Sequence, residues 1–367
     1  MGKSMSKKSQ FNSEGNINLL ISITLLILIA SCGNQIPELG EWQSLGLEDK
    51  LVGKLHIFDN ELYACAGRDG LYRIDLNIGD SDWDYLGLAD TSISSMLESG
   101  VTDIIKANND LVVSYGADFE LQKSGIYRSN DSGETWIASD SGMSNQSYPT
   151  TSQVIKLDQH MSTPESIFAC TATGLIYYSE DGGNAWKRIY GQDGAGAINY
   201  SIIINPNNLN EIWAGGETGR FAPFLIHTED LGENWEIITF PQNFGPYTVD
   251  NAVYDIQMNP KNSNVYYYGM LGVIAKTTDK GRTFKRILNW DDGIYRHWCI
   301  SINPENSSEL ISTGHFLYHS IDGGRTWLKI VPPDDRGELF ALEVDWDNRI
   351  MYVSTSSPGN GIYRYVF

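Results

Sequence analysis

The residues best suited to ligand chemistry are concentrated in one short run near the C-terminal end of the chain. It reads Trp290-Asp291-Asp292-Gly293-Ile294-Tyr295-Arg296-His297-Trp298. Aromatic rings offer flat surfaces for stacking, and fixed charges beside them orient hydrogen bonds, a combination that suits a sugar or a peptide. A polar network that binds nothing would use the same residue types. The ligand-binding candidates of this run are Trp290, Asp291, Arg296, His297 and Trp298.

Composition narrows the classes of partner. The chain has 46 acidic and 26 basic residues, a formal net charge of −20. Because a negative field repels phosphate backbones, DNA and RNA are not expected as partners. The sequence contains no GxSxG, HExxH or phosphate-binding loop, and its 6 histidines lack metal-ligand spacing. No cofactor or metal is expected.

The elements that position these residues are indicated by an internal repeat. Five stretches follow the pattern Ser/Thr-x-Asp-x-Gly-x-x-aromatic, with their aspartates at Asp131, Asp181, Asp230, Asp279 and Asp322. In such a stretch the aspartate can accept hydrogen bonds from the amides of a turn, the glycine allows a positive φ, and the aromatic ring packs between sheets. The aspartates are therefore expected to be structural rather than catalytic or calcium-binding.

This pattern resembles the Asp-box, or BNR repeat. It is known from sialidases, sortilin-type receptors, xyloglucan-cleaving enzymes and photosystem II assembly factors. The resemblance covers residues 41–367 and implies a β-propeller, in which each repeat of 40–50 residues forms a blade of four strands.

The predicted fold is all-β, a single seven-bladed propeller, with six or eight blades as alternatives. Six blades are expected at 52–88, 101–142, 151–191, 198–241, 249–289 and 295–332. The last, 338–367, has only three strand-like runs. The run Trp42–Leu47 is a fourth strand without its first three, so pairing it with the C-terminal blade closes the ring and covers an exposed edge.

Propellers place their ligands on the face built by the loops that lead into the inner strands and by the loops between the second and third strands. The turns of the repeats lie on the opposite face. This arrangement brings the run 290–298 onto the same face as four other candidates: Arg68, Asp69, Arg220 and His315.

Two enzyme families carry these repeats. The Arg-Ile-Pro signature of sialidases does not occur. The run Arg68-Asp69-Gly70-Leu71-Tyr72-Arg73 resembles the stretch around the first catalytic aspartate of the xyloglucan-cleaving family but is two residues shorter, and a second aspartate has no counterpart. The sequence favours a non-catalytic binding platform for a protein or a glycan, with a glycoside hydrolase that uses Asp69 as the alternative.

The N-terminus is typical of an exported lipoprotein. Lys3, Lys7 and Lys8 precede the apolar run 17–30, which ends in Ile29-Ala30-Ser31-Cys32 and resembles a lipobox. Residues 1–31 are expected to be a signal peptide, 32–40 a spacer that begins with lipidated Cys32, and 41–367 the propeller. The lipid would attach a monomer to a membrane, with Gly33 after the cysteine favouring the outer membrane of a Gram-negative bacterium.

Three further cysteines, Cys65, Cys170 and Cys299, lie far apart in apolar runs. Their odd number and wide spacing argue against a disulfide framework. They are expected to be buried free thiols.

Overall fold

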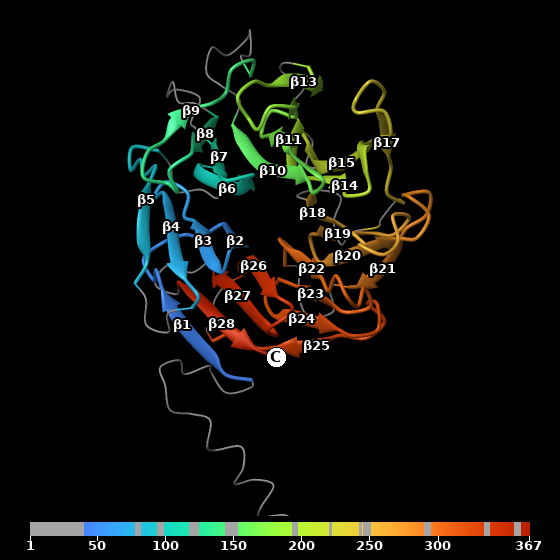
Figure 1. Cartoon of the computed structure of the whole chain (residues 1–367). Helices are drawn as coiled ribbons and strands as arrows, with labels where there is room; N and C mark the ends of the chain where they lie inside the picture. The colour runs from blue at the N-terminus through green and yellow to red at the C-terminus, as the bar shows by residue number, and fades with distance from the viewer. Residues whose placement is uncertain are drawn as a thin grey trace, which may run out of the picture.

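The computed structural model describes residues 40–77, 82–93, 99–116, 125–143, 153–192, 197–219, 222–241, 244, 251–289, 295–333, 338–355 and 361–367. Within them, 28 strands form seven antiparallel sheets of four strands each. Figure 1 shows the sheets as blades around a common axis. The predicted all-β propeller of seven blades is confirmed, and the alternatives of six and eight blades are wrong.

The first four blades follow the chain, each from its inner to its outer strand. Blade 1 contains β2 (Lys54–Phe58), β3 (Glu61–Cys65), β4 (Leu71–Asp75) and β5 (Asp84–Gly87). Blade 2 contains β6 (Gly100–Ala107), β7 (Asp110–Gly116), β8 (Ile126–Ser129) and β9 (Ile137–Ala138). Blade 3 contains β10 (Val154–His160), β11 (Thr163–Thr171), β12 (Ile176–Ser179) and β13 (Lys187–Tyr190). Blade 4 contains β14 (Ala197–Asn205), β15 (Asn208–Thr218), β16 (Pro223–Thr228) and β17 (Glu236–Ile238).

The last three blades complete the ring. Blade 5 contains β18 (Val253–Met258), β19 (Tyr266–Met270), β20 (Val273–Thr277) and β21 (Lys285–Leu288). Blade 6 contains β22 (Ile300–Ile302), β23 (Leu310–Ser312), β24 (Leu317–Ser320) and β25 (Leu328–Ile330). Blade 7 contains β26 (Leu339–Asp345), β27 (Ile350–Thr355), β28 (Ile362–Val366) and, as its outer strand, β1 (Trp42–Gly46).

Ring closure follows the sequence prediction. Strand β1 pairs antiparallel with β28, with Trp42 opposite Tyr365. Figure 1 shows β1 and β28 side by side in this sheet. Pairing β1 with β28 leaves no open break between blade 7 and blade 1, because a strand from the start of the chain satisfies the edge of the last one.

The turns of the repeats use the aspartate as predicted, and the hydroxyl of the first residue adds a second acceptor. In blade 2, Asp131 Oδ1 accepts the amide of Thr135 at 2.9 Å, and Ser129 Oγ accepts the amide of Gly133 at 2.8 Å. Gly133 has φ +92°, which strains any residue with a Cβ. Hydrogen bonds from Ser129 and Thr135 lower the pKa of Asp131 to about 2. Equivalent amide bonds reach Asp181, Asp230, Asp279 and Asp322.

Six tryptophans fasten six of the seven blades to the preceding blade, and blade 5 has Phe284 at this position instead. Trp136 Nε1, for example, donates to the carbonyl of Leu86 at 2.7 Å, and Trp83 Nε1 donates to Leu45 at 2.6 Å. The remaining four are Trp42, Trp186, Trp235 and Trp327, which donate to Val331, Ser139, Ile189 and Ile287. Each indole thus buries a large ring between blades while its N–H keeps a partner.

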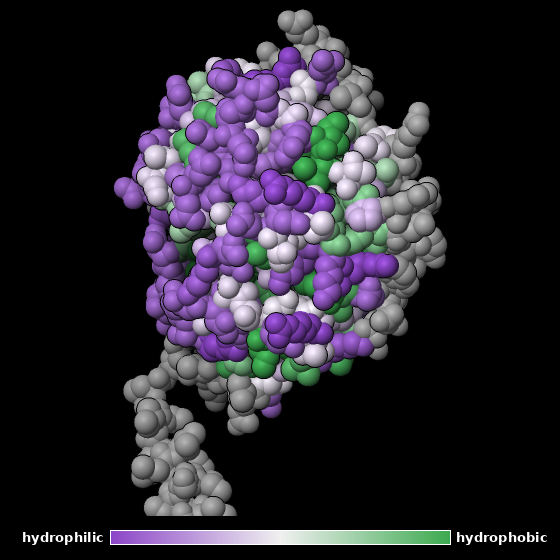
Figure 2. Space-filling model, turned by 90° about the vertical axis from the view of Figure 1, so that its right-hand side faces the viewer, coloured by the Kyte–Doolittle hydropathy of each residue, from purple (hydrophilic) through white to green (hydrophobic). Residues whose placement is uncertain are grey.

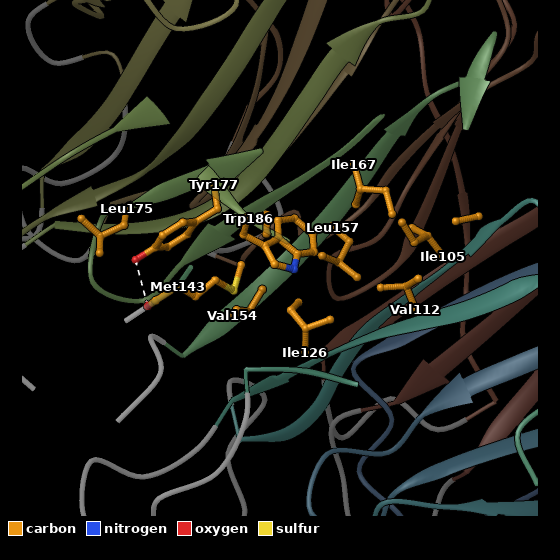
Figure 3. Close-up of a cluster of buried hydrophobic side chains, with 12 residues drawn as sticks. Ile105, Val112, Ile126, Met143, Val154, Leu157, Ile167, Leu175, Tyr177 and Trp186 are labelled. Carbon is orange, nitrogen blue, oxygen red and sulfur yellow. Dashed lines mark hydrogen bonds between the residues drawn. The ribbon is translucent and has the colours of Figure 1, made fainter. Parts of the chain in front are cut away.

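The hydrophobic core is divided among the interfaces between blades. The inner strands are rich in β-branched residues, which fit a pleated, half-buried surface. Figure 3 shows the cluster between blades 2 and 3, where Tyr177 Oη donates to the carbonyl of Met143 at 3.3 Å. Its members include Ile105, Val112, Ile126, Val154, Leu157, Ile167 and Trp186. Cys65, Cys170 and Cys299 are buried free thiols, as expected.

One side of the molecule is mostly polar. Figure 2 shows the side of the molecule that faces right in Figure 1, which is largely hydrophilic with small separate hydrophobic patches. No helix in the described part of the chain is long and apolar enough to cross a membrane. The expected signal peptide, Cys32 and most of the spacer lie outside the described residues.

Candidate binding site at the channel mouth

The seven inner strands begin around one end of the central channel, and each blade contributes one residue there. These residues, named here the mouth ring, are Gly53, Thr102, Ile155, Tyr200, Tyr254, Trp298 and Phe340. Together with Lys54 they line a cavity of about 50 Å³. A space of this size admits one end of a ligand, so most of a bound molecule would lie over the ring.

Four of the seven residues of the mouth ring are aromatic. Blades 4 to 7 place four rings in a continuous arc, named here the aromatic arc: Tyr200, Tyr254, Trp298 and Phe340. Successive centroids are 5.6, 4.7 and 5.5 Å apart. Tyr254 is 6% exposed, while the other three are partly exposed. Tilted and edge-to-face pairs at these distances contribute about 0.5–1.5 kcal/mol each beyond their burial, which favours a fixed arc.

One cation lies against the arc. The guanidinium of Arg296 is 5.9 Å from the ring of Tyr254 and 5.6 Å from that of Trp298. Its Nε donates to Tyr254 Oη at 3.2 Å. The side chain is 41% exposed, so the guanidinium keeps donors available to a ligand.

A carboxylate holds the cation and the largest ring together. Glu338 Oε2 accepts a hydrogen bond from Trp298 Nε1 at 3.0 Å and lies 3.9 Å from Arg296 Nη1. The amide of Arg296 also donates to Glu338 Oε1 at 3.4 Å. Glu338 precedes β26 and the other two precede β22, so this contact spans blades 6 and 7.

Below the mouth ring, polar side chains of the inner strands bind the next blade. Asp103 Oδ2 accepts the amide of Leu157 at 3.0 Å, and Asp158 Oδ2 accepts that of Ile204 at 2.8 Å. Three more backbone amides donate in the same way to a side chain of a neighbouring blade: Ile256 to Ser201, Ile300 to Asp255, and Ile57 to Glu343. These carboxylates therefore have a structural role, because each satisfies an amide of a neighbouring sheet.

Two cations balance part of this acidic lining. His56 Nε2 is 2.6 Å from Asp103 Oδ1, and Lys156 Nζ is 3.0 Å from Asp255 Oδ1. Burial disfavours the charged form of His56, but the pairing with Asp103 raises its pKa overall. Burial also raises the pKa of Glu343 to about 7.

Of the predicted site residues, Arg296 and Trp298 are at the mouth. His297 between them points the other way: it is 4% exposed, and its Nδ1 lies 2.7 Å from the carbonyl oxygen of Thr313. Burial lowers the pKa of His297 to about 4. His315 stacks on Tyr295 with centroids 4.6 Å apart, one residue away from Arg296.

Arg68 and Asp69 occupy the turn between β3 and β4. Gly67 of this turn forms a β-bridge with Val101 in the inner strand of blade 2. Leu271, in the corresponding turn of blade 5, forms a β-bridge with Arg296, which leads into the inner strand of blade 6. Both turns therefore belong to the same face. Asp69 Oδ1 lies 3.8 Å from Lys50 Nζ. Arg220, Trp290 and Asp291 lie outside the described residues.

Sequence reasoning missed Tyr200, Tyr254, Phe340 and Glu338. The first three are inner-strand residues that look like core positions, and only the superposition of the seven blades brings them into one ring. A signal did exist, because each lies in the first half of an apolar inner strand: Tyr254 and Phe340 are the second residues of β18 and β26, and Tyr200 is the fourth residue of β14.

The structure also brings together a cluster that sequence reasoning did not single out. Ligand atoms of Glu211, His227 and Glu229 lie within 4.8 Å of one another. Lys280 Nζ lies among them, 3.0 Å from Glu211 and 2.8 Å from Glu229. Blades 6 and 7 contain an equivalent set of contacts. Glu309 takes the place of Glu211, and its partners Asn303, His319 and Arg349 take the places of Asn205, His227 and Lys280. This repetition indicates an ion network that joins blades.

Comparisons with known proteins identify relatives of the propeller. No protein-family model matches the chain. Xyloglucanase Xgh74A of Acetivibrio thermocellus is 25% identical over 198 residues, which are 44% of this chain and 23% of that protein. The chain thus matches less than a quarter of the length of this curated relative.

Solved structures share the fold. The GH74 xyloglucanase from Xanthomonas campestris has a TM-score of 0.66 at 14% identity, covering 88% of this chain and 53% of that one. YCF48 from Cyanidioschyzon merolae has a TM-score of 0.62 at 13% identity, covering 89% and 98%. A YCF48 structure with bound D1 peptide has a TM-score of 0.61 at 14% identity, covering 92% and 98%. At these identities the likeness concerns the fold alone.

Proposed function

We propose that this protein is a non-catalytic, lipid-anchored propeller of the cell envelope, which binds a protein or a glycan at the channel mouth. The observation that carries the proposal is the aromatic arc with Arg296 against it. Partly exposed aromatic rings and a positioned arginine are the residue types that dominate binding energies at interfaces. The same rings can stack against the apolar face of a sugar.

Preorganisation supports binding at this place. The arc is built on the starts of inner strands, and Glu338 fixes both Trp298 and Arg296. A site on rigid elements loses little conformational freedom when a ligand arrives, so more of the contact energy appears as affinity. The small cavity below the ring offers a place for one projecting group of the ligand.

The chemistry of the carboxylates favours binding over catalysis. Inverting glycoside hydrolysis requires two carboxyl groups on opposite sides of the scissile bond. The channel carboxylates Asp103, Asp158 and Asp255 accept amides of the next blade, which suits a structural role. The candidate Asp69 has the ammonium group of Lys50 beside it.

A glycoside hydrolase is the second candidate, favoured by the 25% identity to a xyloglucanase. Its test is release of reducing sugar from xyloglucan and from any glycan that binds. Release that disappears in Asp69→Asn would establish hydrolysis and contradict the non-catalytic proposal. Binding without release would support it.

The mouth itself is tested with two variants, Trp298→Ala and Phe340→Ala, and with Tyr85→Ala as control. Tyr85 is a 54% exposed aromatic residue in β5, the outer strand of blade 1. Glycan arrays and affinity purification from envelope extracts are run in parallel with all four proteins. The proposal requires that a ligand of the wild type is lost in both mouth variants and kept in the control. Ligands kept by all four proteins would place the site elsewhere.

The proposed location in the cell envelope is tested separately. Replacing Cys32 with Ser removes the thiol that would carry the lipid, so the variant is expected in the soluble fraction while the wild type sediments with membranes. Mass spectrometry of the mature N-terminus reads the acyl chains directly. A wild type that is soluble and unmodified would contradict lipid anchoring. It would not contradict ligand binding at the channel mouth.

A further inference from the structure

A groove between blades 5 and 6 gathers positive charge in a protein of net charge −20. It has a volume of about 410 Å³ and lies between the outer half of blade 5 and the repeat turn of blade 6. Three cations line it: Lys276 of β20, Lys285 of β21 and Arg325 of the turn. The hydroxyl groups of Ser307 and Ser308 lie beside them, whereas the hydroxyl of Thr283, also at the groove, donates to Asp279 Oδ2 at 2.6 Å.

The cations have no counter-ion within the described residues. No carboxylate there lies within 4.0 Å of Lys276, Lys285 or Arg325. The one acidic residue among those that line the groove is Asp322, whose oxygens accept hydrogen bonds from Ser320, Thr326 and the amide of Arg325. Its carboxylate is therefore occupied within its own turn.

Lys276 is held in place. Its Nζ donates to the carbonyl of Gly323 at 3.1 Å and lies 5.0 Å from the centre of the Tyr267 ring. Burial lowers the pKa of Lys276, and the nearby charges of Arg325 and Lys285 lower it further. Like charges thus crowd a partly buried ammonium group, an arrangement that destabilises the fold unless an anion offsets it.

Blade 1 shows what the same position looks like when it is balanced. Arg73 is the equivalent of Lys276. In the sheet register Arg73 lies opposite Tyr63 on one neighbouring strand and Asp84 on the other. Lys276 likewise lies opposite Tyr267 and Lys285. Arg73 forms ion pairs with Glu61 at 3.5 Å and Asp84 at 3.3 Å. The groove there has a similar volume, about 470 Å³, and Glu134 in place of Arg325.

The other blades also avoid like charges at this position. The cross-strand pairs are Arg128 with Ile137, Tyr178 with Lys187, His227 with Glu236, His319 with Leu328, and Arg364 with Gln43. Among the seven described pairs, blade 5 alone sets two cations opposite each other. Like charges directly opposite in a sheet are unfavourable, so this exception indicates a use.

We infer that the groove between blades 5 and 6 is an anion site that takes a phosphate group. Three convergent cations, with hydroxyl donors beside them, match a tetrahedral oxyanion with several acceptor oxygens. The volume admits the phosphate and part of whatever carries it. The site lies among the repeat turns, away from the channel mouth, and does not depend on the function proposed for the mouth.

The test titrates inorganic phosphate into the full chain, purified in a mild non-ionic detergent, by calorimetry at constant ionic strength with chloride as reference. Lys285→Asp restores the pairing of blade 1 and is expected to weaken phosphate binding about tenfold or more. The control is Lys187→Asp, the same change at the equivalent cross-strand position of blade 3, where binding stays at the wild-type value. Arg325→Ala provides a second variant with weakened binding.

Stability provides an independent readout. In chloride, Lys285→Asp should melt at or above the wild-type temperature because the repulsion is removed. Phosphate should raise the melting temperature of the wild type and of Lys187→Asp, but not that of Lys285→Asp. Vesicles of phosphatidylcholine with and without phosphatidic acid separate a lipid headgroup from a free phosphate as the source. A wild type with no more response to phosphate than to chloride would overturn the inference, as would equal losses in Lys285→Asp and Lys187→Asp.

Discussion

Trp298 Nε1 donates a 3.0 Å hydrogen bond to Glu338 Oε2, and this bond joins blade 6 to blade 7 at the mouth of the channel. The same carboxylate oxygen lies 3.9 Å from the guanidinium of Arg296. The Glu338 carboxylate, whose side chain is 19% exposed, therefore positions both the Trp298 ring and the Arg296 guanidinium. Positioning of this kind determines how much of the contact energy a ligand gains.

Replacing Glu338 should weaken binding without unfolding the protein. Glu338→Ala removes both contacts, so Trp298 and Arg296 lose their common partner and affinity is expected to fall about tenfold. Glu338→Gln keeps an acceptor for the indole and should lose less. Near-ultraviolet circular dichroism reports the tryptophan environment, and ligand titration reports affinity. Equal affinity in all three proteins would show that Glu338 does not position the arc.

The ion network of blade 4 should contribute strongly to stability. Glu211 is 2% exposed and accepts hydrogen bonds from Asn205, Tyr266 and Lys280. Glu211→Gln leaves buried partners without their charge and should cost about 3 kcal/mol of the free energy of unfolding, measured in urea. The control is Glu229→Gln, the exposed partner of the same lysine, with an expected loss of about 0–1 kcal/mol. Equal losses would contradict the network.

Glu211 also predicts a dependence on pH. Burial opposes its ionised form, but hydrogen bonds from its partners outweigh this and hold its pKa well below the ordinary value of 4.5. Its stabilisation is therefore complete above about pH 4.5 and is lost as the pH falls below that value. Glu211→Gln should flatten the acid side of the stability profile. An unchanged profile would contradict the pKa shift.

Two histidines should titrate on opposite sides of the ordinary value of 6.5. Pairing with Asp103 raises the pKa of His56, and burial lowers that of His297 to about 4. The stabilisation from His56 is present below pH 6.5 and is lost as the pH rises through its folded-state pKa. Nuclear magnetic resonance of the imidazole protons, assigned with His56→Asn and His297→Asn, measures both. Coincident titrations would contradict these environments.

Closure of the ring should be essential for stability. Deleting residues 40–46 removes β1, leaves the edge of β28 unpaired and breaks the hydrogen bond from Trp42 to Val331. The deletion is expected to cause aggregation, because an exposed strand edge pairs with other chains. Trp42→Phe is the milder control: it keeps the strand and should lose about 1 kcal/mol with the indole hydrogen bond. A monomeric, fully folded deletion variant would contradict closure by β1.

The fold could be predicted because each repeat contains a short motif whose residue types follow from the geometry of one turn. Each turn needs a short acceptor, a residue with positive φ and an aromatic ring, and these requirements fix Asp131, Gly133 and Trp136 at constant spacing. Closure also followed from counting strands, since a blade with three strands and a strand without a blade can only complete each other.

The candidate site could be predicted only in part. Arg296 and Trp298 stood out because they belong to a short run, 290–298, that concentrates aromatic and charged residues. Phe340 and Tyr254 did not, because a single aromatic residue in an apolar strand looks like core. His297 was expected beside them at the mouth, but alternation along the chain turns it into the blade, where Thr313 binds it. Proximity across blades is not visible in local sequence.

The most direct test of the account is the affinity of the Trp298→Ala protein for a ligand of the wild type, measured beside Tyr85→Ala. The account predicts a loss of about thirtyfold or more in Trp298→Ala, as for a central aromatic contact, in a protein that still unfolds cooperatively, and wild-type affinity in Tyr85→Ala. Wild-type affinity in Trp298→Ala would contradict the claim that the channel mouth is the binding site.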